Sequence, residues 1–133
     1  MITAVDRTTR CIVNWTVNTT RVFEVLQEVV DGAVRAKQYF SDGFPCYADV
    51  YYHGAAYQAV LDKSQTYSVE GMNAELRHYL ARLHRRTRCY SKCAKALRRA
   101  LRLFVAAWNQ CQLFRHAHPN YPTNLIDFIS VRV

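Results

Sequence analysis

The chain has 133 residues, a net charge of +8 and a hydrophobic content of 50%. This length fits one domain with one core, and this hydrophobic content excludes a disordered chain. No stretch of about 18 uncharged apolar residues occurs, so the sequence predicts no membrane span. With five cysteines, an odd number, and no export leader, we expect reduced thiols and a cytoplasmic location.

The positive charge lies in the second half of the chain. Residues 1–66 carry six Lys and Arg against seven Asp and Glu, a net −1, while residues 67–133 carry twelve against three, a net +9. A concentrated basic region attracts a polyanion, most often nucleic acid. The alternative is a solvated surface that only aids solubility.

The first three predicted elements are two strands and a helix. Residues 2–6 form a short, mainly apolar segment, and residues 10–17, after a polar turn, are rich in β-branched residues. This pattern predicts two strands joined by a tight turn. Thr19 or Thr20 then caps a helix that ends at Gly32. Its apolar residues recur at helical spacing, at Val22, Val25, Leu26, Val29 and Val30.

The middle of the chain alternates strands with short turns. Residues 34–40 predict a strand, and the turn that follows leaves Asp42 at the C-terminal edge of that strand, where α/β sheets place their chemistry. Pro45 suits the first turn of a short helix that extends to residue 52. Residues 56–61 predict a further strand or extended segment.

Two long helices are predicted in the basic half. The first begins at Ser68 as N-cap, extends to about residue 86, exposes Glu70 in its first turn, and buries Met72, Leu76, Tyr79, Leu80 and Leu83. The second covers residues 92–114. It buries Leu97, Leu101, Phe104 and Trp108 and exposes Lys95, Arg98, Arg99 and Arg102.

Asp42 and Glu70 are the candidate catalytic and metal-binding residues. A carboxylate after a strand and one in the first turn of a later helix can meet at one rim, and two carboxylates can bind Mg²⁺ or Mn²⁺. Such a site suits cleavage or transfer of phosphodiesters. The alternative is that Asp42 belongs to an ordinary Asp-Gly turn and that Glu70 stabilises a helix N-terminus electrostatically.

The residues around both acids resemble a known family. Residues 39–47 read YFSDGFPCY and residues 67–83 read YSVEGMNAELRHYLARL. They are similar to the second and third catalytic motifs of the insertion-sequence-one type of DDE transposase, and the longer motif is the more specific. Residues 85–92, RRTRCYSK, resemble the basic link between that family's last two helices. The similarity covers nearly the whole chain.

The resemblance implies a ribonuclease-H-like α/β fold, in which a mixed sheet flanked by helices presents Asp, Asp and Glu to two divalent metal ions. Residues 1–133 would form a partial catalytic domain with basic C-terminal helices. The family's first catalytic Asp lies on a strand ahead of the one that begins here, which implies an N-terminal truncation. We therefore expect this polypeptide alone to be inactive.

Asp6 offers a competing assignment, because Asp6, Asp42 and Glu70 would make a complete triad. We do not assign Asp6 a catalytic role, because only five residues precede it and the next predicted strand begins within four residues. These lengths leave no separate central strand.

The resemblance also implies a DNA substrate and partner, a bacterial nucleoid-associated location, and possible homo-oligomers of the complete enzyme. Asn73 and Arg77 would contact the scissile strand. The backbone phosphates would be bound by a basic set, Arg82, Arg85, Arg86, Arg88, Lys92, Arg98, Arg99 and Arg102. Two alternatives stay open: a non-catalytic DNA-binding or regulatory remnant, and a metal-dependent nuclease of the same fold.

Overall fold

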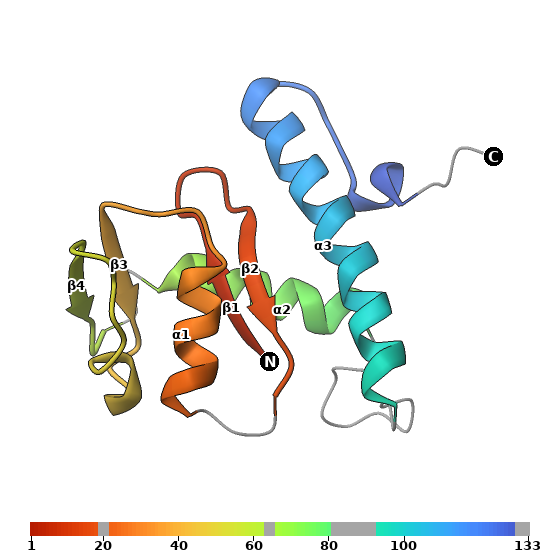
Figure 1. Ribbon diagram of the computed structural model, residues 1–133. Helices are drawn as coiled ribbons and strands as arrows, with labels where there is room; N and C mark the ends of the chain where they lie inside the picture. Colours follow the sequence, from red (N-terminus) through yellow and green to blue (C-terminus); the bar gives the residue numbers. More distant parts are fainter. Residues whose placement is uncertain (19–21, 63–65, 81–92, 130–133) are drawn as a thin grey trace. The chain divides into compact units, whose positions relative to one another are not determined.

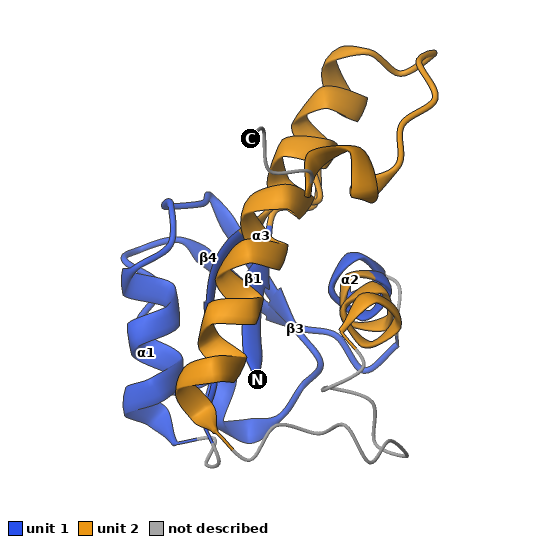
Figure 2. Ribbon diagram, turned by 90° about the vertical axis from the view of Figure 1, so that its right-hand side faces the viewer, with its two compact units in different colours: residues 1–5, 13–71 blue, residues 6–12, 72–133 orange. Residues whose placement is uncertain are grey.

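The structure is a computed structural model that describes residues 1–18, 22–62, 66–80 and 93–129. The chain divides into two compact units, which Figure 2 colours separately. Unit 1 consists of Met1–Val5 and Val13–Gly71, and unit 2 consists of Asp6–Ile12 and Met72–Val133. The length of the chain, which predicts one core, does not reveal this division.

Among the described residues, four strands form two small sheets. Strands β1 (Ile2–Val5) and β2 (Ile12–Thr16) pair with each other, and β3 (Gln38–Ser41) pairs in parallel with β4 (Ala56–Ala59) (Figure 1). The link between β1 and β2 is too short for a parallel crossover, so this pair is antiparallel. The fold is therefore α/β, and the strands that the structure describes form two pairs instead of the single sheet expected.

The core of unit 1 forms around helix α1 (Phe23–Asp31), which packs against β1 and against a 3₁₀ turn, Pro45–Tyr47. Three of the predicted helix positions are buried, at Val25, Leu26 and Val29. Ile2, Val50 and Tyr52 complete this cluster. The apolar spacing therefore identified the buried face of α1 correctly.

The ends of α1 differ from the prediction. Val22 is its N-cap, without a side-chain hydrogen bond, and is 44% exposed, while Thr19 and Thr20 lie outside the described residues. Gly32 follows the helix with a right-handed φ of −81°, so it is no left-handed stop. A Cβ at Gly32 would lie 2.5 Å from Nδ2 of Asn14, which donates to the carbonyl of Val29. The close approach of the Asn14 side chain to the backbone therefore explains why a residue without a Cβ stands at position 32.

Two predictions for the middle of the chain were wrong in extent. Strand β3 begins at Gln38 and not at residue 34. Residues 34–37 are exposed, with Val34 at 78%, so burial of side chains does not extend the strand in this direction. Pro45 starts only the 3₁₀ turn Pro45–Tyr47, which ends well before residue 52. The strand predicted over residues 56–61 is present as β4.

Helix α2 (Tyr67–Tyr79) begins in unit 1 and continues into unit 2. Met72 and Leu76 are buried as predicted, whereas Tyr79 is 40% exposed and Leu80 follows the helix half-buried. Helix α2 ends at Tyr79, whereas the sequence predicted an end at about residue 86. The predicted core residue Leu83 lies outside the described residues.

Helix α3 (Ala94–Ala117) is the longest helix in the described part of unit 2, and a 3₁₀ turn, Leu125–Phe128, packs on it. Leu101, Phe104 and Trp108 are buried as predicted, and Leu97 is half-buried. No helix in the described part of the chain is long and apolar enough to cross a membrane.

The loop between β1 and β2 is attached to α3 within unit 2. The indole Nε1 of Trp108 donates to the carbonyl of Arg10 at 2.9 Å. The side-chain amide of Asn109 accepts from the backbone N–H of Ile12 at 2.8 Å and donates to its carbonyl at 2.9 Å. Asn109 therefore pairs with Ile12 as a neighbouring strand would.

Candidate functional site

Asp42 lies directly after β3, at the strand's C-terminal end, as the sequence predicts. Its side chain is exposed, and its Oδ1 accepts a long hydrogen bond of 3.3 Å from the N–H of Phe44. Gly43 has a φ of +77°, a conformation that side chains disfavour. The local turn therefore directs an exposed carboxylate out of the end of a strand.

The residue before Asp42 is held by a tyrosine that sequence reasoning missed. Ser41 is buried, and its Oγ lies 2.7 Å from the hydroxyl of Tyr57 on β4. The ring of Tyr57 stacks on that of Tyr52, with centroids 4.7 Å apart and planes 6° apart. The backbone carbonyl of Ser41 also accepts from the N–H of Val60 at 2.9 Å. The end of β3 is therefore fixed by side-chain and backbone bonds.

Glu70 is exposed in the first turn of α2, as predicted. The helix nevertheless begins at Tyr67, so Ser68 is not its N-cap. The carbonyl of Thr66 accepts from the N–H groups of Val69 and Glu70, which places the start of the helical bonding ahead of Ser68. The Ser68 side chain is buried, and its hydroxyl has no hydrogen-bond partner among the described residues.

Asp42 and Glu70 therefore belong to one unit, within the segment Val13–Gly71. Carboxylate oxygens are the ligands that Mg²⁺ takes, and two of them would leave positions for water and phosphate. Within the residues that the structure describes, no group of three or more His, Cys, Asp or Glu side chains could hold a metal ion. The donor chemistry of the two carboxylates is of the kind that binds a divalent cation, and a metal site at these residues stays a prediction.

Asp6 has a structural role in the β1–β2 turn, within unit 2. Its Oδ2 accepts from the backbone N–H of Thr9 at 2.8 Å and from the Thr9 hydroxyl at 2.5 Å. These bonds from Thr9 hold the pKa of the Asp6 carboxyl below its usual value. Its backbone also closes the turn, with bonds to Cys11 and Arg10. The role of Asp6 in closing this turn is sufficient to explain an acidic residue at this position, with no catalytic role needed.

The expected DNA-binding residues divide into three sets. Asn73 is half-buried and Arg77 is exposed, both on α2. Arg98, Arg99 and Arg102 are exposed on α3 together with Lys95, and spacings of three and four place them along one side of the helix. The remaining five lie outside the described residues: Arg82, Arg85, Arg86, Arg88 and Lys92.

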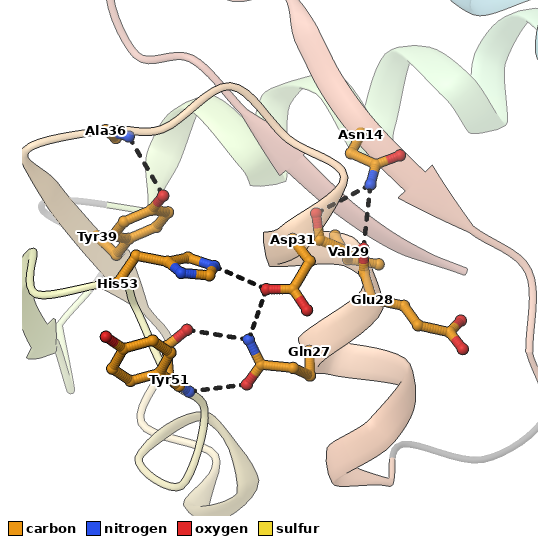
Figure 3. A network of polar contacts seen from close by, with 9 residues as sticks. All are labelled: Asn14, Gln27, Glu28, Val29, Asp31, Ala36, Tyr39, Tyr51 and His53. Carbon is orange, nitrogen blue, oxygen red and sulfur yellow. Dashed lines mark hydrogen bonds and ion pairs between the residues drawn. The ribbon is translucent and has the colours of Figure 1, made fainter.

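A polar network not predicted from the sequence holds the connection between β3 and β4 (Figure 3). The amide of Gln27 accepts from the N–H of Tyr51 at 2.8 Å and donates to its carbonyl at 3.0 Å. Asp31 accepts from Gln27 at 2.9 Å and pairs with His53 at 2.7 Å. Both bonds lower the pKa of the Asp31 carboxyl, and the bond from Gln27 has the larger effect.

The same network holds a strained backbone. His53 has a φ of +54° and Gly54 a φ of +80°. Tyr51, just before them, bonds to Gln27 of α1, and His53 itself pairs with Asp31 at the end of α1. The connection that begins at Asp42 is therefore attached at its far end. Only tertiary contacts between α1 and this connection reveal the arrangement.

The transposase resemblance rests on the two motifs and on the positions of Asp42 and Glu70. Comparison of the chain with family models, with curated proteins and with solved structures gave no match, so the family expected from the sequence stays a prediction.

Proposed function

We propose that this chain is part of the catalytic domain of a DDE transposase, with Asp42 and Glu70 as two of its three carboxylates. One observation carries the proposal. Asp42 directly follows β3 and Glu70 lies in the first turn of α2, both exposed and both in unit 1. Motif residues surround each acid, as the resemblance requires.

A ribonuclease-H-like sheet is part of the same proposal. Such a mixed sheet, without its central first strand, would leave an antiparallel and a parallel pair of strands. The pairs β1–β2 and β3–β4 have this composition, and residues of β1 and β3 pack on the core cluster around α1. The strand pattern supports the fold, and a segment upstream would supply the missing strand and carboxylate.

The chain's own residues would bind the metal and the DNA. The carboxylates of Asp42 and Glu70 would hold Mg²⁺ or Mn²⁺, with open positions for water and phosphate oxygens. A metal ion held by these carboxylates would supply the activation of water or of a 3′-hydroxyl for attack on phosphodiesters. Arg77, exposed on α2 one turn after Asn73, would contact the strand to be cut.

The basic side of α3 would bind backbone phosphates. Lys95, Arg99 and Arg102 are exposed on one side of the helix, opposite buried residues such as Phe104 and Trp108. Phosphate binding releases counterions, so the logarithm of the affinity falls with the logarithm of salt concentration by about 0.9 for each contact. Replacing the three cations by Gln should therefore reduce this slope by roughly 2 to 3.

Fluorescence anisotropy of a labelled duplex, titrated at several salt concentrations, tests this surface. Lys37→Gln is the control, because Lys37 is an exposed cation of unit 1 that lies outside the basic side of α3. The same salt dependence in the triple variant and in the unaltered chain would remove DNA binding by α3 from the proposal.

The DNA sequence upstream of the codon for Met1 tests the catalytic part. An in-frame or frameshifted segment that encodes a strand bearing Asp is expected. Joined to this chain, it should restore Mg²⁺-dependent strand transfer that is lost in Asp42→Asn and in Glu70→Gln. Asp49→Asn, which removes another exposed acid of unit 1, should keep the activity. Mg²⁺-dependent cleavage by the present chain, abolished by Asp6→Asn, would overturn the assignment.

A non-catalytic DNA-binding or regulatory remnant is the second candidate. The basic side of α3 favours it, since this surface belongs to unit 2 and depends on neither carboxylate. DNA binding without strand transfer, in a chain joined to its upstream segment, would select this candidate. Cleavage without strand transfer would instead indicate a nuclease of the same fold.

A further inference from the structure

We propose that the hydroxyl of Tyr57 positions the Asp42 carboxylate for metal binding, acting through the side chain of Ser41. This inference rests on the proposed metal-binding function of Asp42. Tyr57 would be a positioning residue that touches neither metal nor DNA.

The ring of Tyr57 is fixed by its neighbours in unit 1. Tyr57 lies on β4 in register with Tyr39 of β3, and both rings pack against Tyr52, with centroid distances of 4.7 and 4.8 Å. The hydroxyl of Tyr52 in turn donates to the carbonyl of Tyr47 at 2.7 Å. Three packed rings leave Tyr57 little freedom, so its hydroxyl occupies a defined point beside the end of β3.

Ser41 transmits this position to the turn. Its buried Oγ lies 2.7 Å from the hydroxyl of Tyr57 and accepts from the N–H of Gly43 at 3.4 Å. Asp42 lies between the two residues that this hydroxyl connects. The Tyr57 bond holds the serine rotamer, and the serine hydroxyl in turn restrains the Asp42–Gly43 peptide, next to the carboxylate, through its long bond from Gly43.

The carboxylate of Asp42 has little direct restraint of its own, so a second restraint through Ser41 and Gly43 adds to it. Within the described residues, the carboxylate itself accepts one hydrogen bond, of 3.3 Å, from the N–H of Phe44. Gly43 is left-handed, and a Cβ there would lie 3.2 Å from Leu61, so the chain reverses tightly at this point. Metal ligands need outer partners to fix their orientation, and loss of such a partner typically costs 10- to 100-fold in affinity or activity.

The competing explanation is that Tyr57 only fills the core. Tyr57→Phe distinguishes the two, since it keeps the ring and its stacking on Tyr52 and removes only the hydroxyl. If Tyr57 only fills the core, any loss of metal binding in Tyr57→Phe should be accompanied by a matching loss of thermal stability. Loss of positioning would weaken metal binding in protein that is still fully folded.

The test is Mn²⁺ titration of the full chain, followed by paramagnetic broadening of the amide signals of Asp42 and Gly43. Tyr57→Phe and Ser41→Ala should each weaken Mn²⁺ binding roughly 10-fold at a temperature where circular dichroism shows both to be folded. The double variant should bind no more weakly than either single variant, because both changes break the same link. Tyr51→Phe is the control, since Tyr51 is 64% exposed.

Asp42→Asn separates failure of the inference from failure of the proposed function. If Asp42→Asn weakens Mn²⁺ binding while Tyr57→Phe and Ser41→Ala bind as the unaltered chain does, the positioning role is wrong and the metal site stands. Additive losses in the double variant also reject action through Ser41. If Asp42→Asn binds Mn²⁺ unchanged, Asp42 is no ligand and the proposed function fails.

Discussion

Replacing Asn109 by Ala should strongly destabilise the attachment of the β1–β2 loop to α3. The Asn109 amide makes both backbone bonds of Ile12, at 2.8 and 2.9 Å, and Ile12 is 3% exposed. The change therefore removes two hydrogen bonds and leaves a buried N–H and a buried C=O without partners.

The expected cost follows from those two backbone groups. An unsatisfied buried donor or acceptor costs about 1–3 kcal/mol, so two cost about 2–6 kcal/mol. Ala has a higher helix propensity than Asn by about 0.5 kcal/mol, which offsets part of this loss. Entry of water would offset a further part, because Asn109 is half-buried. We expect a net loss of about 2–4 kcal/mol.

Urea unfolding followed by circular dichroism measures the loss, and hydrogen exchange at the Ile12 amide localises it to unit 2. Gln110→Ala is the matched control, because Gln110 is exposed at the next position of the same helix, and a change within about 0.5 kcal/mol is expected. If Asn109→Ala costs no more than the control and the Ile12 amide keeps its protection, the amide pairing does not stabilise the protein.

Three further predictions concern unit 1. Leu26→Ala should lower the free energy of unfolding, measured in urea, by about 2–5 kcal/mol, because Leu26 is 2% exposed. Val34→Ala is the control and should be near neutral, because Val34 is 78% exposed. Equal effects of the two changes would contradict the core assignment. Ser68→Ala should leave stability unchanged or raise it by about 1 kcal/mol in the same assay, since its buried hydroxyl has no partner in the described part; a clear loss would reveal one. The lowered pKa of Asp31 means that its ionised form stabilises the fold above the usual pKa of 3.8, and that this contribution is lost as pH falls through the lowered value. Asp31→Asn should therefore reduce the melting temperature at pH 7 and flatten its acid dependence, which Asp49→Asn should leave intact.

Local patterns were sufficient to predict most elements of the fold. The β-branched run before Thr16 gave β2, and the helical spacing of Val25, Leu26 and Val29 gave the buried face of α1. These features depend on neighbours within one strand or a few helical turns. The position of Asp42 after a strand was confirmed for the same reason.

Element ends and long-range pairs could not be predicted in this way. Ser68 has the residue type of an N-cap, but Thr66 supplies the first carbonyl of α2, so the capping preference was overruled by the way the preceding segment packs. The pairing of Asn109 with Ile12 joins residues 97 apart, and that of Ser41 with Tyr57 joins residues 16 apart. A polar side chain has many potential partners at such separations, and only the folded chain selects one.

The hydrogen bonds of Asp6 and Asp42 make Asp42 the better candidate for a metal ligand. A ligand must offer its lone pairs to a cation, and the Asp6 carboxylate already accepts two short bonds from Thr9 that close the β1–β2 turn. Both bonds are to Oδ2, so this carboxylate already has a structural role in a turn that is attached to α3 through Trp108 and Arg10. Asp42 is exposed and has only a weak bond in its own turn, so it can ligate a metal at little structural cost. Under the proposed function, the third carboxylate would therefore come from the proposed upstream strand and not from Asp6.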